Sequence, residues 1–75
     1  MKILLFGVLA DLLNADRVEI DHQPDLTSLK RELALRFPAI GDQSFTLAIN
    51  KHKPAEDYLI QSSDEIALLP PFSGG

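Results

Sequence analysis

The distribution of apolar and polar residues along the chain predicts four strands. Residues 17–21 and 45–50 alternate between the two classes, which is typical of strands with one buried face. Residues 2–6 form an apolar run bounded by Gly7, as expected for a buried strand. In residues 65–69, alternation places the side chains of Ile66 and Leu68 on one face of a strand and those of the other three residues on the opposite face. The pattern therefore predicts a four-stranded sheet.

One longer helix is predicted over residues 26–37. Asp25 is suited to cap its N-terminus, and Pro38 ends it. Its apolar residues fall at helical spacing on one face, which we interpret as core packing. They are Leu26, Leu29, Leu33 and Phe37.

The remaining segments are predicted as connections. Residues 8–13 have apolar positions for one or two helical turns ending near Asn14. Residues 41–44 are predicted as a loop and residues 51–54 as a tight turn. Residues 55–61 are predicted as a connection with one helical turn.

The predicted order is strand, short helix, strand, helix, strand, loop, strand. One long helix has one mixed sheet to cover, so we expect a two-layer α+β architecture with the main helix on one face. This arrangement matches a β-grasp, the ubiquitin-like fold. We expect the β-grasp domain to span residues 1–69 and a flexible C-terminal Gly-Gly tail to span residues 70–75.

A single helix leaves the other face of the sheet uncovered. Alternation places on this face several apolar side chains, which we predict to form a docking patch for a partner. They are Leu4, Phe6, Ala48, Ala67 and Leu69. The alternative is that residues 8–13 or 55–61 fold over the patch.

Composition narrows the classes of function. The chain has 75 residues, 45% apolar content and a net charge of −4. These values indicate one globular domain and argue against nucleic acid or anionic membranes as partners. His22 and His52 lack ligand spacing, so we predict loop positions and no metal site. Residues 1–10 are a weak match to a signal peptide, so we expect a cytoplasmic protein.

The C-terminal residues are the main functional clue. Two prolines, Pro70 and Pro71, follow the last predicted strand and cannot donate to a sheet ladder, so the chain leaves the fold there. Gly74 and Gly75 then form a thin, adaptable end that can thread a narrow channel. The alternative is an ordinary frayed terminus. The chain has no cysteine, which excludes disulfides, a thiolate nucleophile and a cysteine-based metal site.

An acidic β-grasp domain with the ending Pro-Pro-x-x-Gly-Gly resembles the small subunits of molybdopterin synthase. The similarity spans the chain and includes the Lys-Ile-Leu-Leu-Phe opening, the Asp-Leu-x-x-Leu helix start and the Ala-Ile-Asn strand end. Asp-Glu-Ile-Ala before the final prolines also matches. The chain departs from the family pattern at two positions. Phe72 stands where that family often has a smaller apolar residue, and Lys53 stands where an apolar residue would fit the pattern.

The resemblance implies a sulfur carrier of molybdenum cofactor biosynthesis. An E1-like activating enzyme would use ATP to adenylate Gly75, and a sulfur-donating transferase would convert the acyl-adenylate into a thiocarboxylate. The tail would then enter the large subunit of molybdopterin synthase, a heterotetramer, and donate sulfur to cyclic pyranopterin monophosphate. The inserted residues would be Pro70, Pro71, Phe72, Ser73 and Gly74. The carrier itself would bind no cofactor and would be a non-catalytic subunit.

Two alternatives share part of this chemistry. The sulfur carrier of thiazole synthesis has the same fold and Gly-Gly end but usually lacks the two prolines. A ubiquitin-like modifier would instead form isopeptide bonds through Gly75. The chemistry of the tail does not distinguish a modifier from a sulfur carrier, because both pass through an adenylated intermediate.

Overall fold

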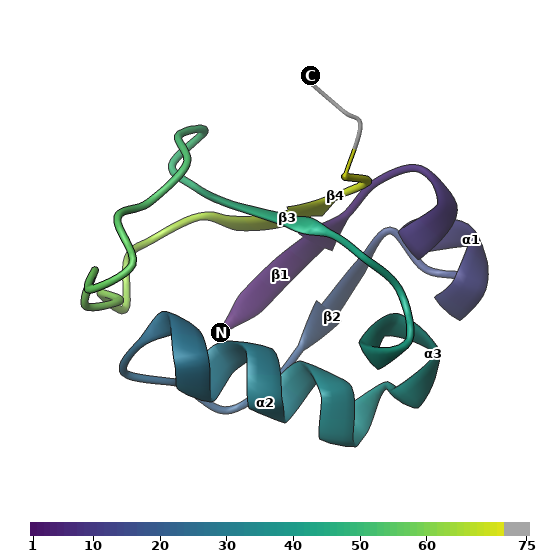
Figure 1. The fold of residues 1–75 in the computed structure, drawn as a ribbon, viewed down its shortest axis with the longest axis horizontal. Coiled ribbons are helices and arrows are strands. Elements are labelled where there is room, and N and C mark those ends of the chain that lie inside the picture. The colour runs from purple at the N-terminus through teal and green to yellow at the C-terminus, as the bar shows by residue number, and fades with distance from the viewer. Residues whose placement is uncertain (72–75) are drawn as a thin grey trace.

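The computed structural model describes residues 1–71 and consists of a sheet with helices on one side (Figure 1). The elements in chain order are β1 (Lys2–Leu5), α1 (Val8–Leu13), β2 (Arg17–Glu19), α2 (Leu26–Arg36), α3 (Pro38–Gly41), β3 (Thr46–Ile49) and β4 (Ile66–Leu69). The strands lie in the order β2-β1-β4-β3. β1 and β4 are parallel, and the other two pairs are antiparallel. The predicted α+β class and mixed four-stranded sheet are confirmed.

The core lies between the sheet and α2, as the periodicities predicted. In β1 and β4, side chains are alternately buried and partly or fully exposed. The inward residues pack against the apolar stripe of α2, which removes both surfaces from water. The buried residues contributed by the central strands and the helix include Ile3, Leu5, Ile66, Leu68, Leu26, Leu29 and Leu33.

Asp25 caps α2, as predicted. Its carboxylate accepts a hydrogen bond of 2.8 Å from the backbone N–H of Ser28. This bond satisfies one of the free donors at the start of the helix, and it holds the pKa of Asp25 below its ordinary value. α2 ends at Arg36, close to the predicted end.

The chain then forms α3, a short helix that the sequence pattern did not predict. Pro38 occupies the first turn, where its fixed φ is favourable and its missing N–H costs nothing. The turn delivers Ile40 to the core, where its side chain is fully buried.

The hairpin after β3 turns two residues earlier than predicted. Asn50 and Lys51 have φ of 53° and 70°, values typical of a two-residue turn between antiparallel strands. Ile49 and His52 close this turn with backbone hydrogen bonds of 2.8 Å and 3.1 Å. The prediction of a tight turn over residues 51–54 was therefore wrong in its position.

The segment from residue 55 to 61 contains a turn but no helix, so the predicted helical turn is also wrong. The N–H of Ile60 donates to the carbonyl oxygen of Pro24 at 2.9 Å. This bond attaches the segment to the start of α2 and places the Ile60 side chain in the core.

Asp64 holds together the loops that precede β4. Its carboxylate accepts hydrogen bonds from the Gln61 N–H (2.7 Å), the Tyr58 hydroxyl (2.7 Å) and the Asn50 amide (2.9 Å). These donors, led by the Gln61 N–H, keep the pKa of Asp64 below its ordinary value. The side-chain oxygen of Asn50 in turn accepts from the Glu65 N–H at 2.9 Å. The network fixes the point at which the chain enters β4.

The burial of α2 generates a stability prediction. Leu29→Ala and Leu33→Ala each remove a fully buried side chain and should lower the free energy of unfolding by about 2–5 kcal/mol. Leu35→Ala is the matched control, because Leu35 lies on the same helix and is 70% exposed. Urea denaturation monitored by circular dichroism measures all three. Equal stability of Leu29→Ala and Leu35→Ala would contradict the assignment of the buried face.

Candidate functional site

The sheet face opposite α2 has a charged end and an apolar end. At the charged end Lys2 lies opposite Glu19 on the neighbouring strand. One step along, Leu4 lies beside Ala67, which in turn lies opposite Ala48. This register makes a continuous apolar row across β1, β4 and β3.

The next row completes the apolar end at the point where β4 finishes. Leu69 lies opposite Thr46, and the N–H of Phe6 donates to the Leu68 carbonyl oxygen at 3.2 Å. This bond holds the Phe6 backbone beside the end of β4. We call the five predicted docking residues on this face the apolar patch; they are Leu4, Phe6, Ala48, Ala67 and Leu69.

The described residues leave the apolar patch open. The Phe6 side chain is 45% exposed, and the other four members are partly buried. The two segments that were considered as a cover contribute instead to the core on the helix side, through Leu9 and Ile60. The patch therefore presents apolar side chains to solvent next to the chain exit.

Pro70 fixes the direction in which the chain leaves the sheet. Its ring is buried, whereas Pro71 is exposed. The ring packs against Gly7, which has a φ of +60°. A Cβ at residue 7 would lie only 2.7 Å from the Cγ atom of Pro70. Gly7 thus meets two demands that other residues do not: a left-handed backbone and close approach of the proline ring.

The other predicted site residues are placed as follows. Phe72, Ser73, Gly74 and Gly75 lie outside the described residues. His22 and His52 are exposed, and within residues 1–71 no group of histidine and acidic side chains is arranged to hold a metal ion. No helix in the same range is long and apolar enough to cross a membrane. Sequence reasoning used Gly7 only as the end of a strand and missed its contact with Pro70.

Comparison with known proteins agrees with this geometry. The ThiS family matches residues 3–75. The molybdopterin synthase sulfur carrier subunit of Dictyostelium discoideum is 36% identical over 99% of this chain and 94% of its own. The subunit of the same name from Arabidopsis thaliana is 30% identical over 100% of this chain and 82% of its own.

Solved structures show the same fold. SAMP1 from Haloferax volcanii superposes with a TM-score of 0.73 at 24% identity, covering 99% of this chain and 97% of its own. A Pyrococcus furiosus protein described as a candidate molybdopterin converting factor subunit 1 gives a TM-score of 0.78 at 17% identity, covering 93% and 94%.

The fold defines a small β-grasp domain that has an exposed apolar patch next to Pro70. The chain belongs to the ThiS family and groups with the molybdopterin synthase sulfur carrier subunits.

The contact between Gly7 and Pro70 generates a second stability prediction. Gly7→Ala should lower the free energy of unfolding by about 1–3 kcal/mol, because it adds both backbone strain at φ +60° and a clash with the proline ring. In a Pro70→Ala background the clash is relieved and only the strain remains, so the same substitution should cost less. A double-mutant cycle measured by urea denaturation gives this difference. Equal costs in both backgrounds would mean that the ring contact does not constrain residue 7.

Proposed function

We propose that this protein is the sulfur carrier of molybdopterin synthase in molybdenum cofactor biosynthesis. The observation that carries the proposal is the position of the apolar patch at the end of β4, directly beside the buried Pro70. A partner that docks on this patch meets the base of the Gly-Gly tail. The similarity to sulfur carrier subunits over the full chain supports this function.

In this proposal the chemistry takes place at the carboxylate of Gly75. A carboxylate is a poor electrophile until one oxygen becomes a good leaving group. An E1-like activating enzyme supplies that group: the carboxylate attacks the α-phosphorus of ATP, pyrophosphate leaves and an acyl-adenylate forms. Hydrosulfide (HS⁻) released by a sulfur-donating transferase then attacks the carbonyl carbon, the bond to the AMP oxygen breaks, AMP departs, the S–H proton passes to solvent and the thiocarboxylate remains.

The large subunit of molybdopterin synthase is the proposed receiver. The tail from Pro70 to Gly75 enters its active site, and the thiocarboxylate donates sulfur to cyclic pyranopterin monophosphate. Hydrolysis of the bond between sulfur and the Gly75 carbonyl carbon restores the carboxylate. The carrier supplies the sulfur and the docking energy, and the large subunit supplies the catalytic groups.

The apolar patch generates a docking prediction. Phe6→Asp and Leu69→Asp should weaken binding to the large subunit, because a carboxylate in an apolar interface loses hydration without gaining a partner. A loss of about 2 kcal/mol or more is typical of central interface positions, which corresponds to about thirtyfold in Kd. Isothermal titration calorimetry with purified large subunit measures the change.

Leu35→Asp is the matched control for docking. It introduces the same side chain at an exposed leucine of α2, on the opposite layer of the domain, and should leave the affinity unchanged. Circular dichroism verifies that each variant is folded. Unchanged affinity of the folded Phe6→Asp and Leu69→Asp proteins would place the docking surface elsewhere.

The tail generates the sharpest functional prediction. Deleting Gly75, or adding one residue after it, should abolish sulfur transfer and leave docking nearly unchanged. One extended residue spans about 3.3–3.6 Å, whereas a misplacement of about 1 Å can cost on the order of a hundredfold in rate. Gly74→Val should also be severe, because a β-branched side chain crowds a channel shaped for bare backbone.

Conversion of the precursor by chemically thiocarboxylated variants and purified large subunit measures this effect. Full activity of the variant with one added residue would contradict the idea that the length of the tail must match the distance to the reacting carbon. Intact-mass measurement of the protein from cells tests the proposed function itself, since replacement of one oxygen by sulfur identifies the thiocarboxylate. Gly75 found joined to lysines of many cell proteins would instead identify a ubiquitin-like modifier, and sulfur transfer into thiazole would identify the other carrier.

A further inference from the structure

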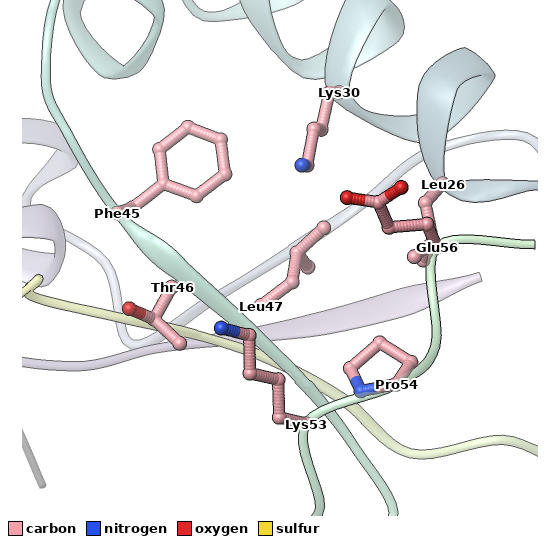
Figure 2. A pocket seen from close by; sticks show the side chains of 8 residues that line it. All are labelled: Leu26, Lys30, Phe45, Thr46, Leu47, Lys53, Pro54 and Glu56. Carbon is pink, nitrogen blue, oxygen red and sulfur yellow. The ribbon is translucent and has the colours of Figure 1, made fainter. Parts of the chain in front are cut away.

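A groove runs along the free edge of β3, on the side of that strand opposite β4. β3 is the last strand in the order β2-β1-β4-β3, so only one side of its backbone pairs with β4. Beside the other side lies a cavity of about 290 Å³ between β3, α2 and the segment that follows the hairpin. Figure 2 shows the side chains that surround it, including Phe45, Leu47 and Leu26.

The register of the hairpin determines which backbone groups face this groove. The N–H of Asn50 donates to the Glu65 carbonyl oxygen on the β4 side at 2.8 Å. Because the direction of these groups alternates along a strand, Ala48 and Thr46 also pair toward β4, whereas Ile49 and Leu47 face outward. His52 satisfies both outward groups of Ile49. The outward N–H and carbonyl of Leu47 have no hydrogen-bond partner among residues 1–71.

The groove also carries two positive charges in a chain whose net charge is −4. Lys30 projects from α2 and Lys53 from the segment after the hairpin, and both ammonium groups point into the open space (Figure 2). Neither lysine forms an ion pair with any described residue. Glu56 lies beside Leu26 in this view and is the one acidic residue of the lining, so the two ammonium groups outnumber it.

We propose that the free edge of β3 binds an extended, acidic segment of a partner protein, which joins the sheet next to β3. An unpaired strand edge is a template for such addition, because main-chain hydrogen bonds supply affinity and alternate side chains supply specificity. Leu47 provides the unpaired donor and acceptor. The two lysines select carboxylates over cationic or neutral side chains.

The two lysines approach the β3 edge from different sides. Lys30 comes from the helix layer, where Phe45 and Leu26 also lie, and Lys53 lies near Thr46, whose side chain belongs to the opposite face of the sheet (Figure 2). Successive side chains of an added strand point to opposite faces. The segment that fits this groove therefore carries two acidic residues at neighbouring positions, which point to opposite faces, so that one carboxylate meets each ammonium group. None of the residues that line this site belongs to the apolar patch.

Nuclear magnetic resonance of the full-length, nitrogen-15-labelled protein tests the proposal. The probe is an acetylated and amidated peptide, Ser-Val-Ile-Asp-Glu-Ile-Val-Ser, whose two neighbouring acidic residues point to opposite faces of an added strand. Its binding should shift the amide signals of Phe45, Leu47 and Lys53, and hydrogen exchange of the Leu47 amide should slow. Lys30→Gln and Lys53→Gln should each weaken binding about two- to fivefold, the effect of an exposed ion pair. Lys2→Gln is the control: it removes one charge outside the groove and should change nothing.

Two modified peptides separate the sources of affinity. A peptide with Asn and Gln in place of Asp and Glu removes the charges, and a peptide with N-methylated central residues removes the backbone donors; both should bind more weakly. The proposal is overturned by an acidic peptide that leaves the Leu47 amide unperturbed, by equal binding of the neutral peptide, or by equal effects of Lys2→Gln and Lys53→Gln. Phe6→Asp should bind the probe normally, which keeps this result distinct from the docking test of the proposed sulfur carrier.

Discussion

The parallel pairing of β1 with β4 is the interaction on which the rest of the structure depends. It joins the first and last strands of the chain at the centre of the sheet, with Ile3 beside Ile66 and Leu5 beside Leu68. These inward residues form the floor on which α2 packs. The outward residues of the same two strands form the middle of the apolar patch. Because both strands run in the same direction, the turn after β1 also meets the exit from β4, where Gly7 receives the ring of Pro70. One ladder therefore positions the core, the apolar patch and the contact between Gly7 and Pro70.

A domain of this size has helices for only one face of its sheet. A chain of about 60 residues buries about 60% of the surface that its unfolded form exposes, and here α2 and α3 cover the inward side (Figure 1). The remaining face stays compatible with solvent because its charged end carries Lys2 and Glu19 and its central row uses the small Ala67 and Ala48. The large exposed side chain, Phe6, lies at the exit end. On this face, the apolar surface is thus concentrated next to Pro70, where β4 ends.

The sequence predicted those parts of the fold that local patterns determine. Alternation identified the inward and outward residues of the strands, and Asp25 identified the start of α2, because strand periodicity and capping act over a few residues. The same alternation placed the five residues of the apolar patch on one face. Leu9, Ile40 and Ile60 could not be recognised as core residues, because isolated apolar residues in short or irregular segments have no diagnostic period. Their burial follows from distant partners, such as the bond between Ile60 and Pro24.

Conformations set by tertiary context were missed for the same reason. The turn at Asn50 and Lys51 lacks the glycine that commonly marks such turns, and it is held by the closing bonds between Ile49 and His52 and by the Asp64 network. At the exit, the sequence indicated only that Pro70 cannot donate to a ladder. Its burial depends on a glycine 63 positions earlier in the chain (70 minus 7), and no local pattern connects the two.

The geometry of β3 separates the two proposed binding surfaces of this small domain. The apolar patch offers side chains that project from a sheet face, whereas the strand edge offers backbone groups of Leu47 in the plane of the sheet. Thr46 lines the groove and lies opposite Leu69 of the apolar patch, so the two surfaces adjoin there. A segment bound at the edge therefore lengthens the sheet without covering Leu4, Phe6 or Ala67. A protein bound at the proposed edge site would leave these residues of the apolar patch free for the partners of the proposed function.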